Sequence, residues 1–274
     1  MRNARMDLEA EYNNRARVAD SAAIIAGWAR DAAAFRAEWP RSTLDIAYGA
    51  GDRERFDLFE AKAPGPVAMF IHGGYWQALD KSFGSHWARG LATRGVTVAV
   101  PSYDLCPTVP LARIADQMRA ACIALHRRTG QRLLVAGHSA GGHLAAMLMA
   151  TDWRAIDPAL PERLVGAALP VSGVFELEPL LGTSVGRGLN LSPAEAQALS
   201  PRYLRPAIGD LHAVVGGAES SEFIRQTHAF AAAWRASGEE IPGANHFTVL
   251  DLFPDPGHAL VSFAADMAGR LAPA

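Results

Sequence analysis

The spacing of apolar and polar residues changes near residue 40, and the two parts of the chain predict different structures. Residues 7–38 are rich in Ala, Glu and Arg, a composition that favours helix. From residue 43 onwards, short apolar runs of strand length alternate with longer segments of helical character. Because such an alternation builds βαβ units, we expect an α/β fold with a mostly parallel sheet flanked by helices.

Several of the apolar runs are followed directly by glycine, as in buried strands that end in turns. The expected strands cover residues 43–48, 56–61, 67–71, 96–100, 133–136, 164–171, 211–215 and 237–241. The expected helices among them cover residues 83–93, 111–128, 143–149, 223–236 and 262–271. Residues 173–206 are rich in Gly, Pro, Leu and Ser, so we expect them to leave the sheet and form part of a lid.

Length and composition are those of a single globular domain. The chain has 274 residues, a common size for one α/β domain, and half of them are hydrophobic, which is enough for a large core. We expect one domain over 1–274, with a helical segment over 1–40 at its N-terminal end.

Charge and targeting signals exclude several classes of partner. The net charge is −2 and no basic stripe is present, which argues against nucleic acid and anionic lipid. We find no secretory signal and no apolar run of membrane-spanning length, so we expect a cytoplasmic protein with no membrane partner. The two cysteines, Cys106 and Cys122, have no metal-ligand spacing and are expected to be reduced.

The pentapeptide Gly-His-Ser-Ala-Gly at 137–141 stands between an expected strand and an expected helix. A sharp strand-to-helix turn lifts a serine hydroxyl clear of the sheet, and small flanking residues allow the backbone to turn tightly. The motif alone occurs by chance in glycine-rich chains, but its position makes Ser139 the candidate nucleophile.

A serine hydroxyl needs a base within hydrogen-bond reach, and histidine is the usual one. His246 follows the expected strand 237–241, so it lies past the carboxyl end of a strand, where function collects in parallel sheets. Each remaining downstream histidine is too close to the serine, at the wrong end of a strand, within a helix or in a Pro-Gly-rich stretch. These are His143, His212, His228 and His258. We therefore expect His246 to be the base.

The acid that orients this base should come between serine and histidine in the chain. Glu219 lies directly past the strand 211–215, whereas Asp210 precedes that strand and lies at its other end. Glu222 is an alternative, although it could instead cap the helix that follows. We expect Glu219 to be the acid and keep Glu222 open.

Acyl transfer also needs backbone N–H groups directed at the developing oxyanion. Ala140 supplies one of them, because it follows the nucleophile. The segment His72-Gly73-Gly74-Tyr75-Trp76 follows a buried strand, and its paired glycines let the backbone face a substrate. A plain turn is the alternative, but the serine motif further along favours an oxyanion loop with Gly73 and Gly74 as donors.

Taken together, these segments resemble the α/β-hydrolase superfamily in its hormone-sensitive-lipase-like branch, and more narrowly the kynurenine formamidases, or arylformamidases. The resemblance covers nearly the whole chain. It rests on Tyr12-Asn13-Asn14-Arg15, His72-Gly73-Gly74-Tyr75-Trp76 with Lys81, Gly137 to Ala145, Ser172 to Phe175, Ser200-Pro201, Val215 to Phe223 with Gln226, and His246-Phe247. The family usually has aspartate where this chain has Glu219.

This resemblance implies the α/β-hydrolase fold and hydrolysis of the formamide of N-formyl-kynurenine, without a metal or another cofactor. Ser139 would attack the formyl carbon, His246 would take its proton, and the N–H groups of the oxyanion loop and Ala140 would hold the oxyanion. Tyr75 and Trp76 would line an aromatic wall for the substrate. His143, one helical turn beyond the serine, is a further candidate for substrate binding. Tyr12 and Asn13 would order the N-terminal segment near the site.

Two other functions remain open at this point. Many chains of this branch are general carboxylesterases or amidases of small acyl groups, and residue types near a pocket do not determine the acyl group. A hydrolase fold can also serve as a non-catalytic receptor, but such chains usually have a damaged triad or oxyanion loop. In each case the partner is a small molecule, and the sequence leaves open whether the protein is a homodimer.

Overall fold

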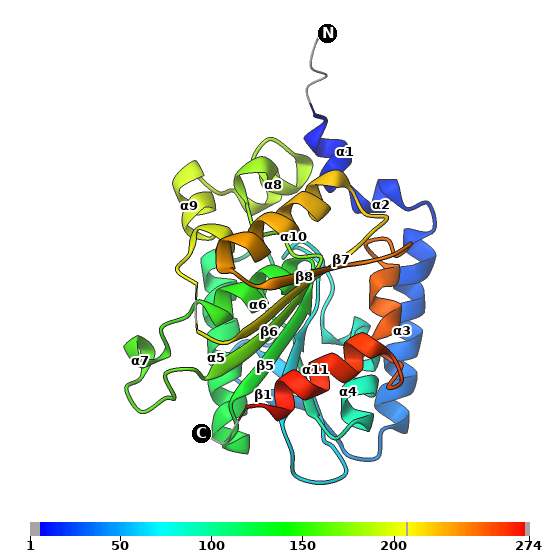
Figure 1. The fold of residues 1–274 in the computed structure, drawn as a ribbon, viewed down its shortest axis with the longest axis vertical. Coiled ribbons are helices and arrows are strands. Elements are labelled where there is room, and N and C mark those ends of the chain that lie inside the picture. The colour runs from blue at the N-terminus through cyan, green and yellow to red at the C-terminus, as the bar shows by residue number, and fades with distance from the viewer. Residues whose placement is uncertain (1–5, 207, 272–274) are drawn as a thin grey trace.

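The computed structural model describes residues 6–206 and 208–271, and within them eight strands form one sheet with helices on both faces (Figure 1). The strand order is β1-β2-β4-β3-β5-β6-β7-β8. The strands are β1 (Ser42–Ala47), β2 (Arg55–Phe59), β3 (Val67–Ile71), β4 (Thr97–Pro101), β5 (Leu133–His138), β6 (Val165–Val171), β7 (Asp210–Gly216) and β8 (Ser237–Ile241). Only the pairings of β2 with β1 and β4 are antiparallel among the described residues. The expected α/β fold with a mostly parallel sheet is confirmed.

Every expected strand is present, with ends that differ from the expectation by at most two residues. The central strands β3, β5 and β6 are buried along their whole length. Parallel strands covered on both faces carry near-continuous apolar runs, which explains why the sequence shows them clearly. The edge strand β8 is instead mostly exposed and carries two glutamates.

The helices form two layers, one on each face of the sheet. The α-helices are α1 (Leu8–Tyr12), α2 (Asn14–Arg17), α3 (Ser21–Glu38), α4 (Arg89–Thr93), α5 (Leu111–Thr129), α6 (Ala140–Met149), α7 (Trp153–Ile156), α8 (Ser184–Leu189), α9 (Pro193–Ala198), α10 (Ser221–Trp234) and α11 (Ala259–Gly269). The 3-10 helices are η1 (Lys81–Phe83), η2 (Ser85–Ala88), η3 (Glu178–Leu180), η4 (Pro201–Tyr203) and η5 (Thr248–Leu252). Helices α5, α6 and α10 pack on one face, and α3, α4 and α11 on the other.

The N-terminal segment is less regular than its composition predicts. Three helices replace a continuous helical stretch, and the first break falls at Asn13, which ends α1 and begins α2. The Asn13 side chain accepts a hydrogen bond from the Ala16 N–H at 3.1 Å, so it caps the new helix and interrupts the old one. Residues 1–5 of this segment, residue 207 and residues 272–274 lie outside the described residues.

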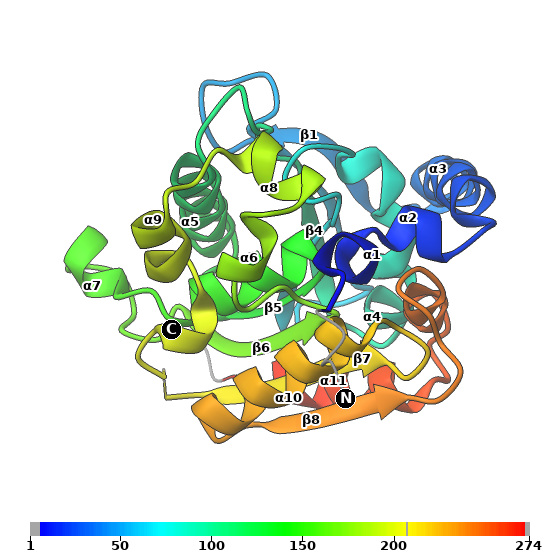
Figure 2. The ribbon, with the colours of Figure 1, turned by 90° about the horizontal axis from the view of Figure 1, so that it is seen from above.

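Two other expected regions differ in detail. The helix expected over 83–93 is two 3-10 turns followed by the short α4, with Gly84 ending the first turn. Residues 173–206 do leave the sheet, and they carry two 3-10 helices together with α8 and α9. In the view from above, α1, α2 and α8 lie at the end of the molecule that is nearest to the viewer (Figure 2). Across the described residues, no helix combines the length and apolar character needed to span a membrane.

Candidate active site

Ser139 occupies a sharp turn between β5 and α6. Its backbone has φ 56° and ψ −115°, a conformation that a residue with a side chain rarely adopts. The Ser139 N–H donates to the carbonyl of Val171 on β6 at 2.8 Å, which ties the turn to the sheet. The elbow expected at 137–141 is therefore present, and it lies at the carboxyl end of a central strand.

His246 and Glu219 meet at the same end of the sheet. The Nδ1 atom of His246 lies 2.6 Å from Oε2 of Glu219, and the carboxylate side chain is fully enclosed. The second oxygen, Oε1, accepts hydrogen bonds from the Ser172 hydroxyl at 2.5 Å and from the Gly216 N–H at 2.7 Å. With both oxygens engaged, the buried carboxylate has one orientation and holds the imidazole in one orientation.

His138, inside the serine pentapeptide, supports the loop that carries His246. Its Nε2 atom forms a hydrogen bond with the backbone carbonyl of His246 at 2.7 Å, so this nitrogen carries the proton. The two rings lie 4.6 Å apart. Burial, together with the neighbouring His246, holds the pKa of His138 well below its usual range. His138 is thus a neutral donor that fixes the position of the second histidine.

The segment that follows β3 passes directly beside the serine. A Cβ atom on Gly73 would lie 3.1 Å from the Cβ of Ser139, which shows how closely the two backbones approach. Gly74 has φ +108°, and the next two residues, Tyr75 and Trp76, have φ values of 52° and 57°. Three successive residues with positive φ make a tight turn that L side chains rarely adopt.

A cavity of about 180 Å³ brings these groups together, since Ser139, His246, Gly73 and Gly74 all line it. Apolar side chains form much of the remaining wall. These are Ile25, Trp28, Leu79, Val185 and Phe247. The N-terminal segment contributes Tyr12, Asn13, Asn14 and Arg15. The cavity is thus built by the segments that follow the strands, by residues of α1, α2 and α3, and by α8 of the excursion.

Of the three residues expected to bind substrate, only Tyr75 lines the cavity. Trp76 and His143 are completely buried, and their rings meet edge to face at 4.9 Å. The Nε2 atom of His143 is bonded to the carbonyl of Leu199 at 2.7 Å, so this side chain faces the excursion instead of the cavity. Neighbouring side chains of a tight turn point in different directions, and for this reason Trp76 packs into the core behind Tyr75.

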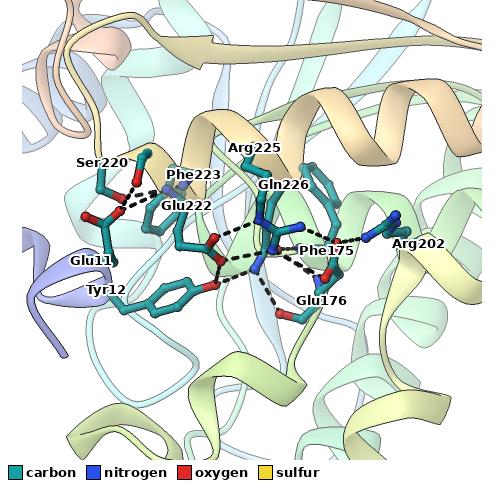
Figure 3. Close-up of polar contacts among 11 residues, drawn as sticks. Glu11, Tyr12, Phe175, Glu176, Arg202, Ser220, Glu222, Phe223, Arg225 and Gln226 are labelled. Atoms are coloured by element: carbon teal, nitrogen blue, oxygen red, sulfur yellow. Dashed lines mark hydrogen bonds and ion pairs between the residues drawn. The ribbon is translucent and has the colours of Figure 1, made fainter. Parts of the chain in front are cut away.

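Glu222, the alternative acid, faces away from His246. Its Oε2 atom accepts a hydrogen bond from the Tyr12 hydroxyl at 2.8 Å, and its carboxylate pairs with Arg225 (Figure 3). The hydrogen bonds from Arg225 are the largest influence that lowers the pKa of Glu222. The structure therefore brings Glu219, and not Glu222, to the imidazole.

Several residues of the site carry no signal in the local sequence. Ser172 contacts Glu219, and Asn14, Arg15, Ile25 and Trp28 line the cavity, yet none belongs to a chemical motif. For Asn14, Arg15 and Ser172 the hint was the family resemblance of the segments 12–15 and 172–175, and Ile25 and Trp28 had none. Within the described residues, no group of three or more His, Cys, Asp and Glu side chains is arranged to hold a metal ion.

Comparison with known proteins identifies the family of the chain. The family model described as alpha/beta hydrolase fold matches residues 68–246. A kynurenine formamidase of Salmo salar is 29% identical over 247 residues, which cover 84% of this chain and 83% of the relative. The crystal structure of a putative thioesterase from Silicibacter sp. has a TM-score of 0.86 and 36% identity, covering 94% of this chain and 98% of the other.

A more distant structure is similar to this chain in fold only. The esterase of the archaeon Pyrobaculum calidifontis has a TM-score of 0.72 at 18% identity, covering 90% of this chain and 91% of that one. The family match spans well over half of the chain, and it includes the serine elbow, the Glu219 loop and His246. The chain belongs to the α/β-hydrolase fold family and is a hydrolase.

Proposed function

We propose that the protein is a serine hydrolase that cleaves aryl formamides such as N-formyl-kynurenine, with Ser139 as nucleophile, His246 as base and Glu219 as acid. The observation that carries this proposal is the 2.6 Å contact between His246 and the buried Glu219, next to a serine on a strained elbow in the same cavity. Kynurenine formamidases at 29% identity over most of the chain support the choice of substrate.

The first half of the reaction forms a formyl-enzyme. Because Nδ1 of His246 is engaged by Glu219, its Nε2 atom is left to take the proton from the Ser139 hydroxyl. The Ser139 Oγ adds to the formyl carbon, and the carbonyl oxygen becomes an oxyanion that accepts hydrogen bonds from backbone N–H groups. Gly73, Gly74 and Ala140 supply these donors. The C–N bond then breaks, and the proton on His246 passes to the nitrogen of the departing aryl amine.

Water completes the cycle. His246 removes a proton from a water molecule, whose oxygen adds to the formyl carbon of the acyl-enzyme. The bond between that carbon and Ser139 Oγ breaks, the serine recovers the proton from His246, and formic acid leaves as formate. Throughout, the negative charge of Glu219 stabilises the imidazolium that forms in each half of the reaction.

The cavity suits a flat aromatic leaving group. Its walls are largely apolar and include the rings of Trp28, Tyr75 and Phe247. A planar aryl amine buries its surface well against such rings, while Ser139 and His246 line the same cavity and can reach the formyl group.

A second candidate function is hydrolysis of small-acyl esters or thioesters. The observation that favours it is the 36% identity, over nearly the whole chain, to a structure described as a putative thioesterase. The same three residues and the same donors would serve, because ester and amide hydrolysis share the tetrahedral intermediate.

Two measurements test the proposal. A fluorophosphonate probe should label the wild type at Ser139, and Ser139→Ala should not be labelled; persistent labelling of the variant would contradict the role of this serine. Rates should then be compared for formyl and acetyl groups on aniline and phenol, with N-formyl-kynurenine included. We expect the formanilides to be turned over fastest. Turnover of the esters with no turnover of the formamides would replace the first candidate with the second.

A further inference from the structure

We infer that Tyr12 is a positioning residue of the active site, which joins the oxyanion loop 73–76 to the start of α10. The inference rests on the proposed function for the roles of the two regions that it joins. Tyr12 lies in α1, far in sequence from either region, and the residue is 1% exposed. Three separate contacts of this one residue reach the site from different directions.

The first contact is made by the backbone of Tyr12. Its carbonyl oxygen accepts a hydrogen bond from the Tyr75 hydroxyl at 2.6 Å. The same hydroxyl accepts a hydrogen bond from the Asn14 side chain at 3.4 Å, so the N-terminal segment holds Tyr75 by two residues. Tyr75 is the residue next to Gly74, and the loop that it anchors lies against Ser139.

The second contact is made by the Tyr12 hydroxyl, which lies between two side chains of α10 (Figure 3). It donates to Oε2 of Glu222 at 2.8 Å and accepts from Nε2 of Gln226 at 2.6 Å. Gln226 in turn accepts hydrogen bonds from the N–H groups of Phe175 and Glu176, at the start of the excursion. Both hydrogen bonds of this buried hydroxyl are therefore made to α10, which in turn holds the start of the excursion.

The third contact is made by the Tyr12 ring. It packs edge to face on Phe223, with ring centroids 5.8 Å apart, and Phe223 lies 4.6 Å from the ring of His246. Phe223 also follows Glu219 by four residues, at the N-terminal end of α10. The ring thus supports the same side of the site that holds the imidazole and its carboxylate.

Helix α1 itself is fixed in place, so Tyr12 is held on a firm support. Glu11 accepts hydrogen bonds from the Ser221 hydroxyl at 2.7 Å and from the Glu222 N–H at 2.9 Å, at the first turn of α10. Glu9 accepts from the N–H and the hydroxyl of Ser184, at the start of α8. These contacts bind α1 to α10 and to α8.

The oxyanion loop needs such an external restraint. Tyr75 and Trp76 both have positive φ, and residues with side chains keep this conformation only where surrounding contacts hold them. The bond from Tyr75 to Tyr12 is a contact of this kind, because it joins residues 63 positions apart. The Tyr12 hydroxyl is hydrogen-bonded to α10, so the oxyanion loop is connected to this helix. The loop and the part of the site that contains Glu219 therefore keep a fixed relative position.

The test uses Tyr75→Phe, Tyr12→Phe and the double variant of the full chain. Tyr75→Phe removes the bond to the Tyr12 carbonyl, and Tyr12→Phe removes the bonds to α10 while it keeps the ring. Tyr48→Phe is the matched control, because the Tyr48 hydroxyl also donates to a backbone carbonyl, that of Ser102 at 2.5 Å, away from the cavity. The measurements are kcat and KM on the best substrate, and hydrogen exchange of the amides in residues 73–79.

We expect kcat to fall roughly 10- to 100-fold in Tyr75→Phe, with KM within about twofold, because displaced oxyanion donors affect the transition state more than binding. The two contacts act in series. The kcat of the double variant should therefore be only slightly below that of the less active single variant. Exchange in 73–79 should be faster in both single variants and unchanged in Tyr48→Phe.

The inference is overturned if both single variants keep the wild-type kcat and exchange rates, or if their effects on kcat simply multiply. If Tyr12→Phe fails to fold, the kcat and the amide exchange rates of Tyr75→Phe alone test the inference. A wild type that reacts with neither probe nor substrate would contradict the proposed function. The exchange comparison would then still show whether Tyr12 joins the loop to α10.

Discussion

The Nδ1 atom of His246 lies 2.6 Å from Oε2 of Glu219, whose side chain is fully enclosed. The family resemblance of the sequence implies that related proteins have aspartate at this position. The aspartate side chain is shorter than that of glutamate by one methylene. The structure shows how the longer side chain fits, since Oε1 is held by Ser172 and by the N–H of Gly216, so Oε2 alone reaches the imidazole.

Replacing this carboxylate by an amide should reduce turnover strongly. In Glu219→Gln the charge that stabilises the imidazolium is lost, and we expect kcat to fall by about 10³- to 10⁴-fold. Steady-state kinetics on the best substrate would measure the loss. Glu222→Gln is the comparison, because Glu222 contacts Tyr12 and Arg225, and its loss should be far smaller. The reverse order of the two losses would make Glu222 the acid.

Ser172 should affect both the rate and the stability. Ser172→Ala removes the 2.5 Å hydrogen bond to the buried Glu219, so we expect a loss of about 1–3 kcal/mol in unfolding free energy. A carboxylate that turns more freely should also lower kcat, by roughly tenfold. Urea denaturation and kinetics would measure the two effects.

Ser200→Ala is the control for this prediction. The Ser200 hydroxyl is equally buried and bridges the Leu177 N–H and the Ala196 carbonyl, away from the cavity. Its replacement should cost a similar amount of stability and leave kcat unchanged. A Ser172→Ala variant with the wild-type kcat would show that Glu219 needs no support from this hydroxyl.

Arg15 should contribute to the selectivity of the enzyme for formanilides that carry a carboxylate. Among the described residues that line the cavity, Arg15 alone has a Lys, Arg, Asp or Glu side chain. For a formanilide that carries a carboxylate, Arg15→Gln should raise KM about 2- to 5-fold, the size expected for an exposed charge pair. KM for unsubstituted formanilide should not change, and added salt should reduce the difference.

Arg17→Gln is the control for Arg15. Arg17 lies on the same short helix and 3.9 Å from Glu11, and it does not line the cavity. Its removal should leave KM for both substrates unchanged. An equal rise in KM for the charged and the neutral substrate in Arg15→Gln would show that the side chain acts by packing and not by charge.

The stability of the protein should fall in mildly acidic solution. Burial lowers the pKa of several histidines from 6.5 to about 4. These are His72, His86 and His143. Between these two values the unfolded chain binds more protons than the folded one, so stability is full above about pH 6.5 and is lost as the pH falls towards 4.

His143 allows this to be tested one residue at a time, because it lies outside the cavity. In His143→Gln, the loss of unfolding free energy between pH 6.5 and 4 should be smaller than in the wild type by up to about 1.4 kcal/mol per pH unit. Urea denaturation at several pH values would measure the slopes. Equal slopes in the two proteins would show that His143 does not titrate in this way.

Local patterns in the sequence were sufficient for the sheet and for the serine elbow. The buried strands β3, β5 and β6 are continuous apolar runs, and such runs arise from burial on both faces of a parallel sheet. The elbow at 137–141 is a local conformation, so its small residues are visible in the sequence. Glu219 and His246 could be selected because each follows a strand, and parallel strands bring their carboxyl ends to one edge.

The N-terminal segment and the orientation of single side chains could not be predicted in this way. Composition predicts helix over 7–38, but the Asn13 side chain accepts a hydrogen bond from the Ala16 N–H and divides the segment, so a short polar side chain decides this locally. Trp76 and His143 looked like cavity residues, yet they face each other in the core. The direction of each side chain depends on where neighbouring residues leave space. A local sequence pattern contains no information about those neighbours.

The sequence by itself determined the fold, the elbow and the order of serine, acid and histidine, because these depend on periodicity and on residues close together in the chain. The tertiary structure alone decided that Glu219 reaches His246 while Glu222 binds Tyr12, a residue 210 positions away. It also decided that the Tyr75 hydroxyl meets the Tyr12 carbonyl beside the cavity. Contacts between such distant residues follow from the packing of α1 on α10 and of α10 on the sheet, and packing is a property of the folded chain as a whole.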